Sequence, residues 1–292
     1  MAQNRLTYSE FVNTLKDCDI QKGDVILFFS SLKQIGPLEC GNDRKGILEF
    51  YYSALKDLIG EEGTLLVFTG FPDYGRYGTP FILEESPSRM GVFSEYVRTL
   101  PNSIRSMHPI VNVTGNGKLA KEICGGHHFE GQGYKSPWGK MHRRNAKIVS
   151  MGVYAFTIVH YIESIYGVPY KYVKIYKTPV YANGIEVPGP FTMTNRYLDY
   201  SIAYNHDKYK KYLIDLGLTK IRPIGRSCVY VTKIKPAFDV LIEKLNEDRY
   251  FFLEKTPVFR YGEYPADGLT GDSKYIYSKP GPNIIDSNLR NT

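Results

Sequence analysis

The chain has 292 residues, 42% of them hydrophobic and 23% charged, which supports a folded core and is not the composition of a disordered protein. No apolar run approaches the ~18 to 20 residues of a membrane helix, and the polar start of the chain lacks the apolar core of a signal peptide, so we expect a cytoplasmic protein. The net charge of +7 indicates an anionic partner (nucleic acid, an anionic membrane surface or a phosphate-bearing small molecule), unless it reflects only a lysine-rich composition.

The first third of the chain alternates helix and strand. Tyr8–Asp17 has apolar residues at helical spacing, with Ser9 as the expected N-cap, and a buried-type strand follows at Val25–Phe29. A second helix is predicted over Ile47–Ile59 and a second strand over Gly63–Phe68. This alternation predicts an α/β protein with a parallel or mixed sheet flanked by helices.

The first strand runs directly into a hydroxyl-rich turn and a helix, formed by Ser30, Ser31, Leu32 and Lys33. In such a turn, backbone amides and hydroxyls can meet a phosphate or amide group of a ligand. Two serines in a simple strand-exit turn remain the alternative interpretation.

Residues 69–87 form a long irregular segment rich in glycine, proline and aromatic residues. A loop of this length in a compact domain is usually functional or disordered, and its aromatic content favours function. Within it we select Asp73, Tyr74 and Arg76 as candidate substrate-binding residues.

The middle of the chain carries a helix at Met90–Thr99, a strand at Ile110–Thr114 and a short helix at Lys118–Ile123. Ser136 and Pro137 are the expected N-cap and first residue of a further helix.

The same region contains three histidines in different sequence settings. His108 precedes a proline and therefore has an extended, fixed backbone. His127, His128 and Glu130 have the chemistry of metal ligands, but adjacent histidines rarely face one ion, so we expect surface residues and no metal.

The segment Thr157–Glu163 follows an apolar run at Ile148–Val153. If a helix begins at Thr157, His160 and Glu163 are three residues apart and project from one face. An imidazole held by a carboxylate is a ready general base, although most pairs at this spacing are ordinary surface pairs.

The second half becomes richer in strands. Strands are expected over 172–178 and 184–193, a helix over 199–216, a strand over 228–231 and a helix over 236–246. We predict one domain over 1–254, with its catalytic segment at 148–166, a β-rich elaboration at about 170–195, and a tail over 255–292 that wraps the surface or is partly disordered.

Several short motifs then follow one another in a characteristic order. They are Ser30-Ser31-Leu32, Gly63-Thr64-Leu65, Ser86-Pro87-Ser88-Arg89-Met90-Gly91, Arg105-Ser106-Met107-His108-Pro109, Gly133 with Ser136-Pro137, Gly152-Val153 with Thr157-x-x-His160-x-x-Glu163, and Gly225-Arg226-Ser227. The series resembles the aminoglycoside 3-N-acetyltransferase family, also called the antibiotic N-acetyltransferase family, over roughly residues 5 to 250. Each motif is weak alone, whereas the ordered set is specific.

The resemblance implies an α/β fold unlike the common acetyltransferase fold, an acyl-CoA donor, and direct acyl transfer to a sugar amine. It implies that His160 is the base, supported by Glu163. It also implies that the strand-end serines, with Leu32 and Lys33 beside them, and the pair Ser106 and His108 face CoA.

The sequence departs from the family pattern after Phe81, where Ile82-Leu83 stands in place of an Asp-Pro. The region facing the acceptor is therefore altered. Aminoglycosides are polycations and favour an acidic cleft, which fits poorly with a net charge of +7. We therefore expect a nucleotide-linked (dTDP-type) amino sugar of polysaccharide biosynthesis as the acceptor, with an aminoglycoside and antibiotic resistance as the alternative.

Thr157 is a candidate donor to the oxyanion of the tetrahedral intermediate, and an N-cap role for it is an equal alternative. The cysteines Cys18, Cys40, Cys124 and Cys228 have no metal-binding spacing and are interpreted as reduced structural thiols; a Cys acyl-enzyme is the alternative to direct transfer.

Two rival interpretations come from other classes of protein. A serine-type thioester hydrolase would use Ser31 or Ser106, and a nucleic-acid-binding protein is suggested only by charge. We expect neither nucleic acid nor a membrane as partner; a dimer is possible.

Overall fold

The computed structural model describes residues 5–197 and 202–258, and the backbone of 284–286. Most of the tail predicted over 255–292, including 259–283 and 287–292, lies outside the described residues. Among the helices that the structure describes, none has both the length and the apolar composition needed to cross a membrane.

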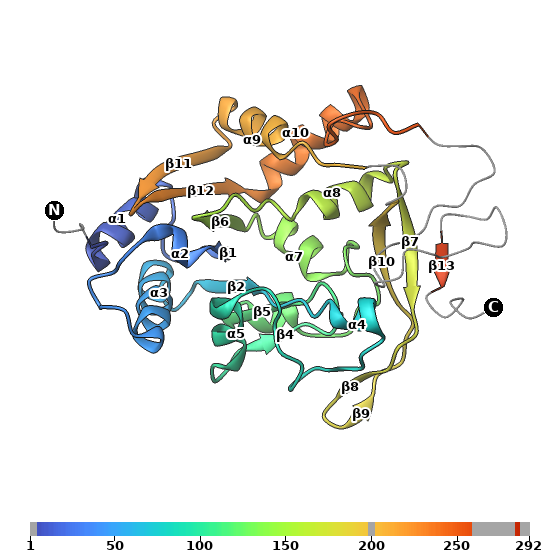
Figure 1. Cartoon of the computed structure of the whole chain (residues 1–292), viewed down its shortest axis with the longest axis horizontal. Coiled ribbons are helices and arrows are strands. Elements are labelled where there is room, and N and C mark those ends of the chain that lie inside the picture. The colour runs from blue at the N-terminus through green and yellow to red at the C-terminus, as the bar shows by residue number, and fades with distance from the viewer. Residues whose placement is uncertain (1–4, 198–201, 259–283, 287–292) are drawn as a thin grey trace.

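Within the described ranges, the central sheet has the strand order β11-β12-β6-β1-β2-β5-β4 (Figure 1). β1 (Val25–Ser30) pairs in parallel with both β2 (Thr64–Phe68) and β6 (Lys147–Met151). The outer strands run antiparallel to their neighbours; they are β5 (Val113–Gly117), β4 (Ile104–Arg105), β12 (Ser227–Lys233) and β11 (Thr219–Ile224). The mixed sheet predicted from the sequence is confirmed.

Helices cover both faces of this sheet because its central strands are apolar on both sides. Ile26 and Phe28 of β1 pack in a core cluster with α1 (Tyr8–Asp17), α2 (Leu32–Ile35), α3 (Arg44–Ile59) and α5 (Val92–Thr99). Val25 and Leu27 alternate with them and pack in the opposite cluster. That cluster contains residues of α6 (Ala120–Cys124), α7 (Pro137–Arg143), α8 (Val159–Tyr166), α9 (His206–Asp215) and α10 (Ile234–Glu247).

The β-rich part of the second half forms an edge of the molecule opposite α1 (Figure 1). β7 (Lys171–Tyr176) pairs antiparallel with β10 (Phe191–Arg196) and parallel with β13 (Ile284–Asp286). A smaller sheet joins β8 (Val180–Ala182) to β9 (Ile185–Glu186) and β3 (Phe81–Ile82). The long segment 69–87 packs against this part: α4 (Asp73–Tyr77) lies within it, and Phe71, Tyr74 and Phe81 share a core cluster with Tyr176 and Phe191.

Several local predictions were wrong. The N-cap of α1 is Thr7, not Ser9: the Thr7 hydroxyl and the Glu10 carboxylate form a capping box. The strand expected over Ile110–Thr114 begins at Val113, because Pro109 and the buried Asn112 hold the preceding residues in turns. The helix expected from 199 begins at His206, capped by Asn205, while 198–201 lie outside the described residues.

Candidate active site

His160 and Glu163 lie on one face of α8, as their spacing predicts. α8 follows β6 through the turn 152–158, which is closed by the Ser150 hydroxyl: it donates to the Ala155 carbonyl at 2.8 Å and accepts from the Ala155 amide at 3.3 Å. The helix itself begins at Val159 rather than at Thr157. His160 Nδ1 lies 3.0 Å from Glu163 Oε2.

The Glu163 side chain is fully buried, and both of its oxygens accept hydrogen bonds. Lys171 Nζ at 2.6 Å and the Tyr204 hydroxyl at 2.9 Å donate to Oε2, the oxygen that also meets His160. The Tyr170 hydroxyl donates to Oε1 at 2.8 Å. Burial alone would raise the pKa of Glu163, but the charge of Lys171 and the hydrogen bond from His160 outweigh it and lower this pKa to about 2.

These contacts fix the protonation of the imidazole. A carboxylate only accepts hydrogen bonds, so the ring nitrogen facing Glu163 must carry the proton: Nδ1–H donates and Nε2 keeps its lone pair. Burial, and then the charge of Lys171, lowers the pKa of His160, so the neutral ring is the form present at neutral pH. The His160 side chain is 37% exposed, which leaves the ring open to a substrate. The pair can therefore act as a general base.

Thr157 lies in the turn before α8, where its carbonyl accepts a hydrogen bond from the His160 amide. The first turn of the helix is capped by Ile158 without a side-chain hydrogen bond, so the N-cap role considered for Thr157 is wrong. Among the described residues, no partner is present for the buried Thr157 hydroxyl. Its expected contact with the oxyanion stays a prediction.

A pocket of about 370 Å³ lies at the carboxyl ends of the adjacent parallel strands β1 and β6. Parallel sheets commonly bind ligands at this edge. The sequence-predicted residues Ser30, Ser31, Leu32 and Lys33 all line it. The start of α5, from Gly91 to Ser94, forms the facing wall, and Val153 and Ala155 of the turn before α8 complete it.

Gly152 permits the close approach of the two strand ends. Its φ is +71°, and a Cβ atom there would lie 2.6 Å from the Ser31 carbonyl oxygen. A larger residue would be strained by its backbone angle and would push β6 away from the serine turn.

The structure does not bring Ser106 and His108 to this pocket. Both are fully buried. The Ser106 hydroxyl accepts from the Val113 amide at 2.9 Å, and His108 Nδ1 accepts from two backbone amides at 3.3 Å while Nε2 lies 3.0 Å from the Thr192 carbonyl. Burial holds the pKa of His108 at about 3, so the ring is neutral. These contacts make both residues supports of the fold, and neither side chain is accessible to a ligand here.

The three candidates of the loop 69–87 have different environments. Asp73 forms an ion pair with Arg89, with 2.8 Å between Oδ2 and Nη2. Tyr74 is buried and donates to the Thr178 carbonyl at 2.7 Å, whereas Arg76 is exposed. The structure therefore leaves only Arg76 and part of Asp73 open to a substrate.

His128 is buried, so its expected place on the surface is wrong, whereas His127 and Glu130 are exposed. Within 5–197 and 202–258, no group of three or more His, Cys, Asp or Glu side chains is arranged to hold a metal ion. The four cysteines are free thiols, and burial raises the pKa of Cys124 to about 12, which opposes its use as a nucleophile.

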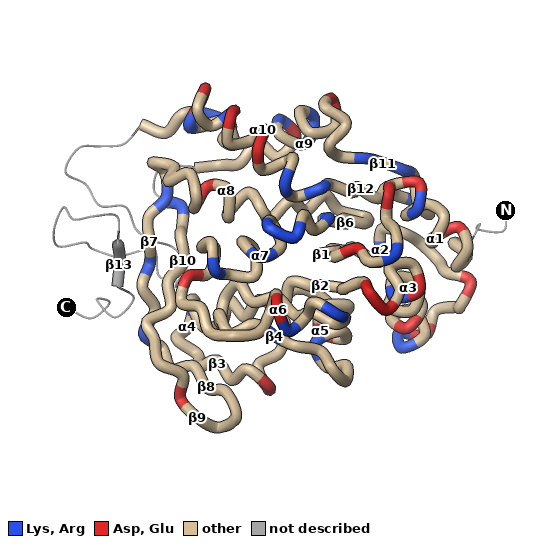
Figure 2. The backbone as a smooth tube through the Cα atoms, turned by 180° about the vertical axis from the view of Figure 1, so that it is seen from behind, with Lys and Arg blue, Asp and Glu red and all other residues tan. Residues whose placement is uncertain are grey.

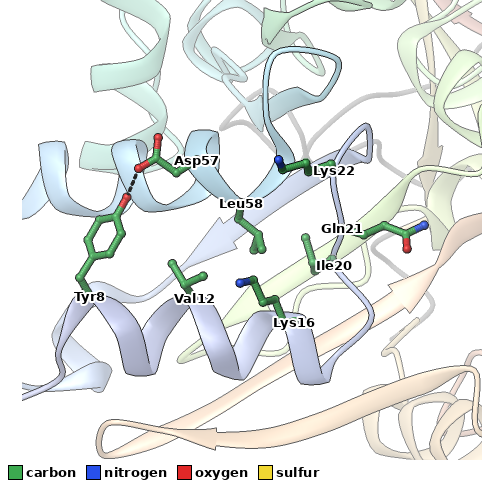
Figure 3. A pocket seen from close by; sticks show the side chains of 8 residues that line it. All are labelled: Tyr8, Val12, Lys16, Ile20, Gln21, Lys22, Asp57 and Leu58. Carbon is green, nitrogen blue, oxygen red and sulfur yellow. Dashed lines mark hydrogen bonds between the residues drawn. The ribbon is translucent and has the colours of Figure 1, made fainter.

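Sequence reasoning missed Tyr170, Lys171 and Tyr204, although all three contact Glu163. Tyr170 and Lys171 follow Glu163 by seven and eight residues and enter a strand, so helical spacing gives no signal for them. A second pocket, of about 440 Å³, lies between α1 and α3 and is lined by none of the predicted site residues. Figure 3 shows its lining residues, with the Tyr8 hydroxyl donating to Asp57.

The fold and site together define an α/β protein with a His/Glu pair on a helix next to the carboxyl edge of a mixed sheet. The sequence matches the aminoglycoside 3-N-acetyltransferase family over residues 27–246, which is most of the chain. The chain belongs to this family of acyl-CoA-dependent N-acetyltransferases.

The chain is similar to several proteins at low sequence identity. The chain is 25% identical over 203 residues to aminoglycoside N(3)-acetyltransferase VII of Streptomyces paromomycinus, covering 62% of this chain and 68% of the relative. It is 27% identical over 205 residues to the prophage-derived aminoglycoside N(3')-acetyltransferase-like protein YokD of Bacillus subtilis, covering 62% and 72%. The structure of AAC-IIIb in a binary complex with CoASH has a TM-score of 0.70 at 19% identity, covering 87% of this chain and 100% of that one. This structure establishes the shared fold.

Proposed function

We propose that this protein transfers an acyl group from acyl-CoA to the amino group of a sugar, with His160 as the general base. The observation that carries the proposal is the His160–Glu163 pair: Nδ1 of a partly exposed imidazole lies 3.0 Å from a fully buried carboxylate oxygen. A carboxylate can only accept, so the proton belongs on Nδ1 and Nε2 is free to accept one. The family match supports the same chemistry.

The reaction removes two protons from the sugar ammonium: one passes through His160 to the CoA sulfur, and the other goes to solvent water. A sugar ammonium is not nucleophilic, so His160 Nε2 first removes a proton from it, directly or through one water. The amine nitrogen then attacks the thioester carbonyl, and the tetrahedral intermediate collapses with departure of the CoA thiolate. The imidazolium, stabilised by Glu163, returns its proton to that sulfur, and the nitrogen releases its second proton to solvent water, which gives the neutral amide and free CoA. Thr157 is the proposed donor to the oxyanion through its buried hydroxyl.

We place acyl-CoA in the pocket at the ends of β1 and β6. Lys33 and the start of α5 both line this pocket, and no side chain caps that helix, so its first amides are available to an anion such as a diphosphate. The CoASH complex of AAC-IIIb supports this donor for a protein of the same fold. Ser106 and His108 act in this proposal only by holding the loop 105–113.

Aminoglycosides are the first acceptors to test, because the relatives carry that activity in their names and one solved relative, AAC-VIa, binds sisomicin. A second candidate is a nucleotide-linked amino sugar. The net charge of +7 favours it, and the described cationic groups that act on His160 are Lys171 and Arg196, a poor setting for a polycation.

The test is a thiol-release assay with acetyl-CoA against aminoglycosides and nucleotide-linked amino sugars. His160→Ala should lower kcat by at least about 10²-fold, because the base is lost, with acyl-CoA binding measured by calorimetry nearly unchanged. His142→Ala is a matched control, since that half-buried imidazole contacts Tyr161 instead of a carboxylate. Turnover near the wild-type level in His160→Ala would overturn the assignment of the base.

Thioester hydrolysis without any amine, at rates equal to transfer, would instead favour a hydrolase. Ser106 is a poor nucleophile for such a reaction because its hydroxyl is buried and already accepts from the Val113 amide. Ser31 lines the pocket and is the serine to substitute in that case.

A further inference from the structure

Lys171 is a second charged group at the His160–Glu163 pair, and it comes from β7 rather than from α8. Lys171 is only 7% exposed. Nζ lies 2.6 Å from Glu163 Oε2 and 3.3 Å from His160 Nδ1. A buried ammonium group at this distance acts on both members of the pair.

The geometry also shows which group accepts the hydrogen bond from Lys171. Because Nδ1 must donate to Glu163, it has no lone pair for Lys171, so the ammonium donates to the carboxylate alone. Its charge therefore neutralises Glu163 and opposes a positive charge on the neighbouring ring. With Glu163 as its only charged neighbour, the ring would have a higher pKa and would be protonated more readily. An imidazolium cannot act as a base.

We propose that Lys171 is a positioning residue that keeps His160 unprotonated, by neutralising Glu163, while the carboxylate holds the ring in its Nδ1–H form. The proposal rests on the proposed function only in taking His160 as the base.

Other groups act on the same ring and must be considered. The Tyr204 hydroxyl, from the segment before α9, lies 3.4 Å from Nδ1 and donates to Glu163 Oε2. Arg196, at the end of β10, adds a weaker positive influence and stacks over Tyr204 at 5.8 Å. Tyr170 reaches only Oε1. Of the described groups, Lys171 is the cation that contacts both Glu163 and His160.

The test is an NMR titration of the full-length protein labelled at histidine, without substrates. The chain has six histidines, and the His160 signal is identified by its absence in His160→Asn. In Lys171→Met the pKa of His160 should rise by about one unit or more. The acid limb of the pH profile of kcat/KM should shift to higher pH by the same amount, so that kcat/KM falls about tenfold at a pH on that limb. Lys171→Arg keeps the charge and should retain the wild-type titration.

Lys147→Met is the matched control. Lys147 is another buried lysine, 2.6 Å from a carboxylate of Asp24, at the opposite end of β6 from the turn that leads to α8. It should leave the titration of His160 unchanged. Equal shifts in Lys147→Met and Lys171→Met, or no shift in the latter, would overturn the proposal.

If Lys171→Met fails to fold because Glu163 is left uncompensated, the comparison of Glu163→Gln with Glu163→Gln/Lys171→Met replaces it. The pKa of His160 should be higher by about one unit in the double variant, which lacks the positive charge. Equal values would contradict the role of Lys171. The titration needs no turnover, so it remains informative even if His160→Ala still transfers acyl groups and the proposed function fails.

Discussion

The Glu163 carboxylate is the group that the other polar residues of the site contact. It is fully buried, yet it accepts hydrogen bonds from His160, Lys171, Tyr204 and Tyr170. A buried anion is tolerated only when such contacts replace water. The same contacts hold the imidazole in one tautomer, so the stability of this region and the chemistry of His160 depend on the same atoms.

Glu163→Gln should lower kcat by about 10² to 10³-fold, because an amide no longer stabilises the imidazolium and presents a donor as well as an acceptor. It should also destabilise the fold by about 3 kcal/mol, because Lys171 stays buried without its counter-ion. Steady-state kinetics and urea unfolding measure the two effects. Asp24→Asn, which breaks the buried pair with Lys147, should reduce stability while leaving kcat near the wild-type value. A loss of kcat equal in both variants would trace the effect to general destabilisation.

At the scale of elements, predictions held where local pattern decides structure. The helix at Tyr8–Asp17 and the strands around Val25 and Thr64 are strongly periodic or apolar, and they form within one or two residues of the expected bounds. β11 was missed because Ile221, Arg222 and Pro223 are exposed and show no alternation of apolar and polar residues, so pairing with β12 rather than burial makes it a strand.

In the candidate site, too, contacts within one helix could be predicted from the sequence and contacts between elements could not. The relation of His160 to Glu163 is a property of one helix, so the sequence could predict it. The contacts of Lys171 and Tyr204 depend on how β7 and the segment before α9 pack on α8, and no spacing along the chain encodes that. Ser106 and His108 show the reverse case, since residues that their motif assigns to the CoA site are instead buried in backbone hydrogen bonds away from the pocket.

The start of α1 gives a test at this scale. Thr7→Ala should lower the free energy of unfolding by about 1 kcal/mol, because the Thr7 hydroxyl caps the Glu10 amide and the Glu10 carboxylate accepts from the Thr7 amide. Ser9→Ala is the control: the Ser9 hydroxyl only approaches that of Thr7, at 3.3 Å, so its removal should cost little. Urea unfolding distinguishes the two. A larger loss for Ser9→Ala would mean that the helix begins later than the structure shows.

At the scale of the whole molecule, the positive charge is dispersed. In the view of Figure 2, Lys and Arg occur on many elements with Asp and Glu between them, and they do not form a single basic face. A dispersed charge of +7 still produces a long-range field, which attracts anions and repels cations until salt screens it. The charge of the acceptor should therefore be visible in the salt dependence of its KM.

For a nucleotide-linked amino sugar, raising the ionic strength from about 0.02 M to about 0.2 M should raise KM several-fold, because screening removes an attraction. For an aminoglycoside the same change should lower KM, since the net charge of +7 repels a polycation. Both values are measured by thiol release at saturating acetyl-CoA, with a neutral amine as the control whose KM should not change. An aminoglycoside KM that rises with salt would show that acidic groups at the acceptor site outweigh the net charge, and would decide for aminoglycosides against the nucleotide-linked sugar.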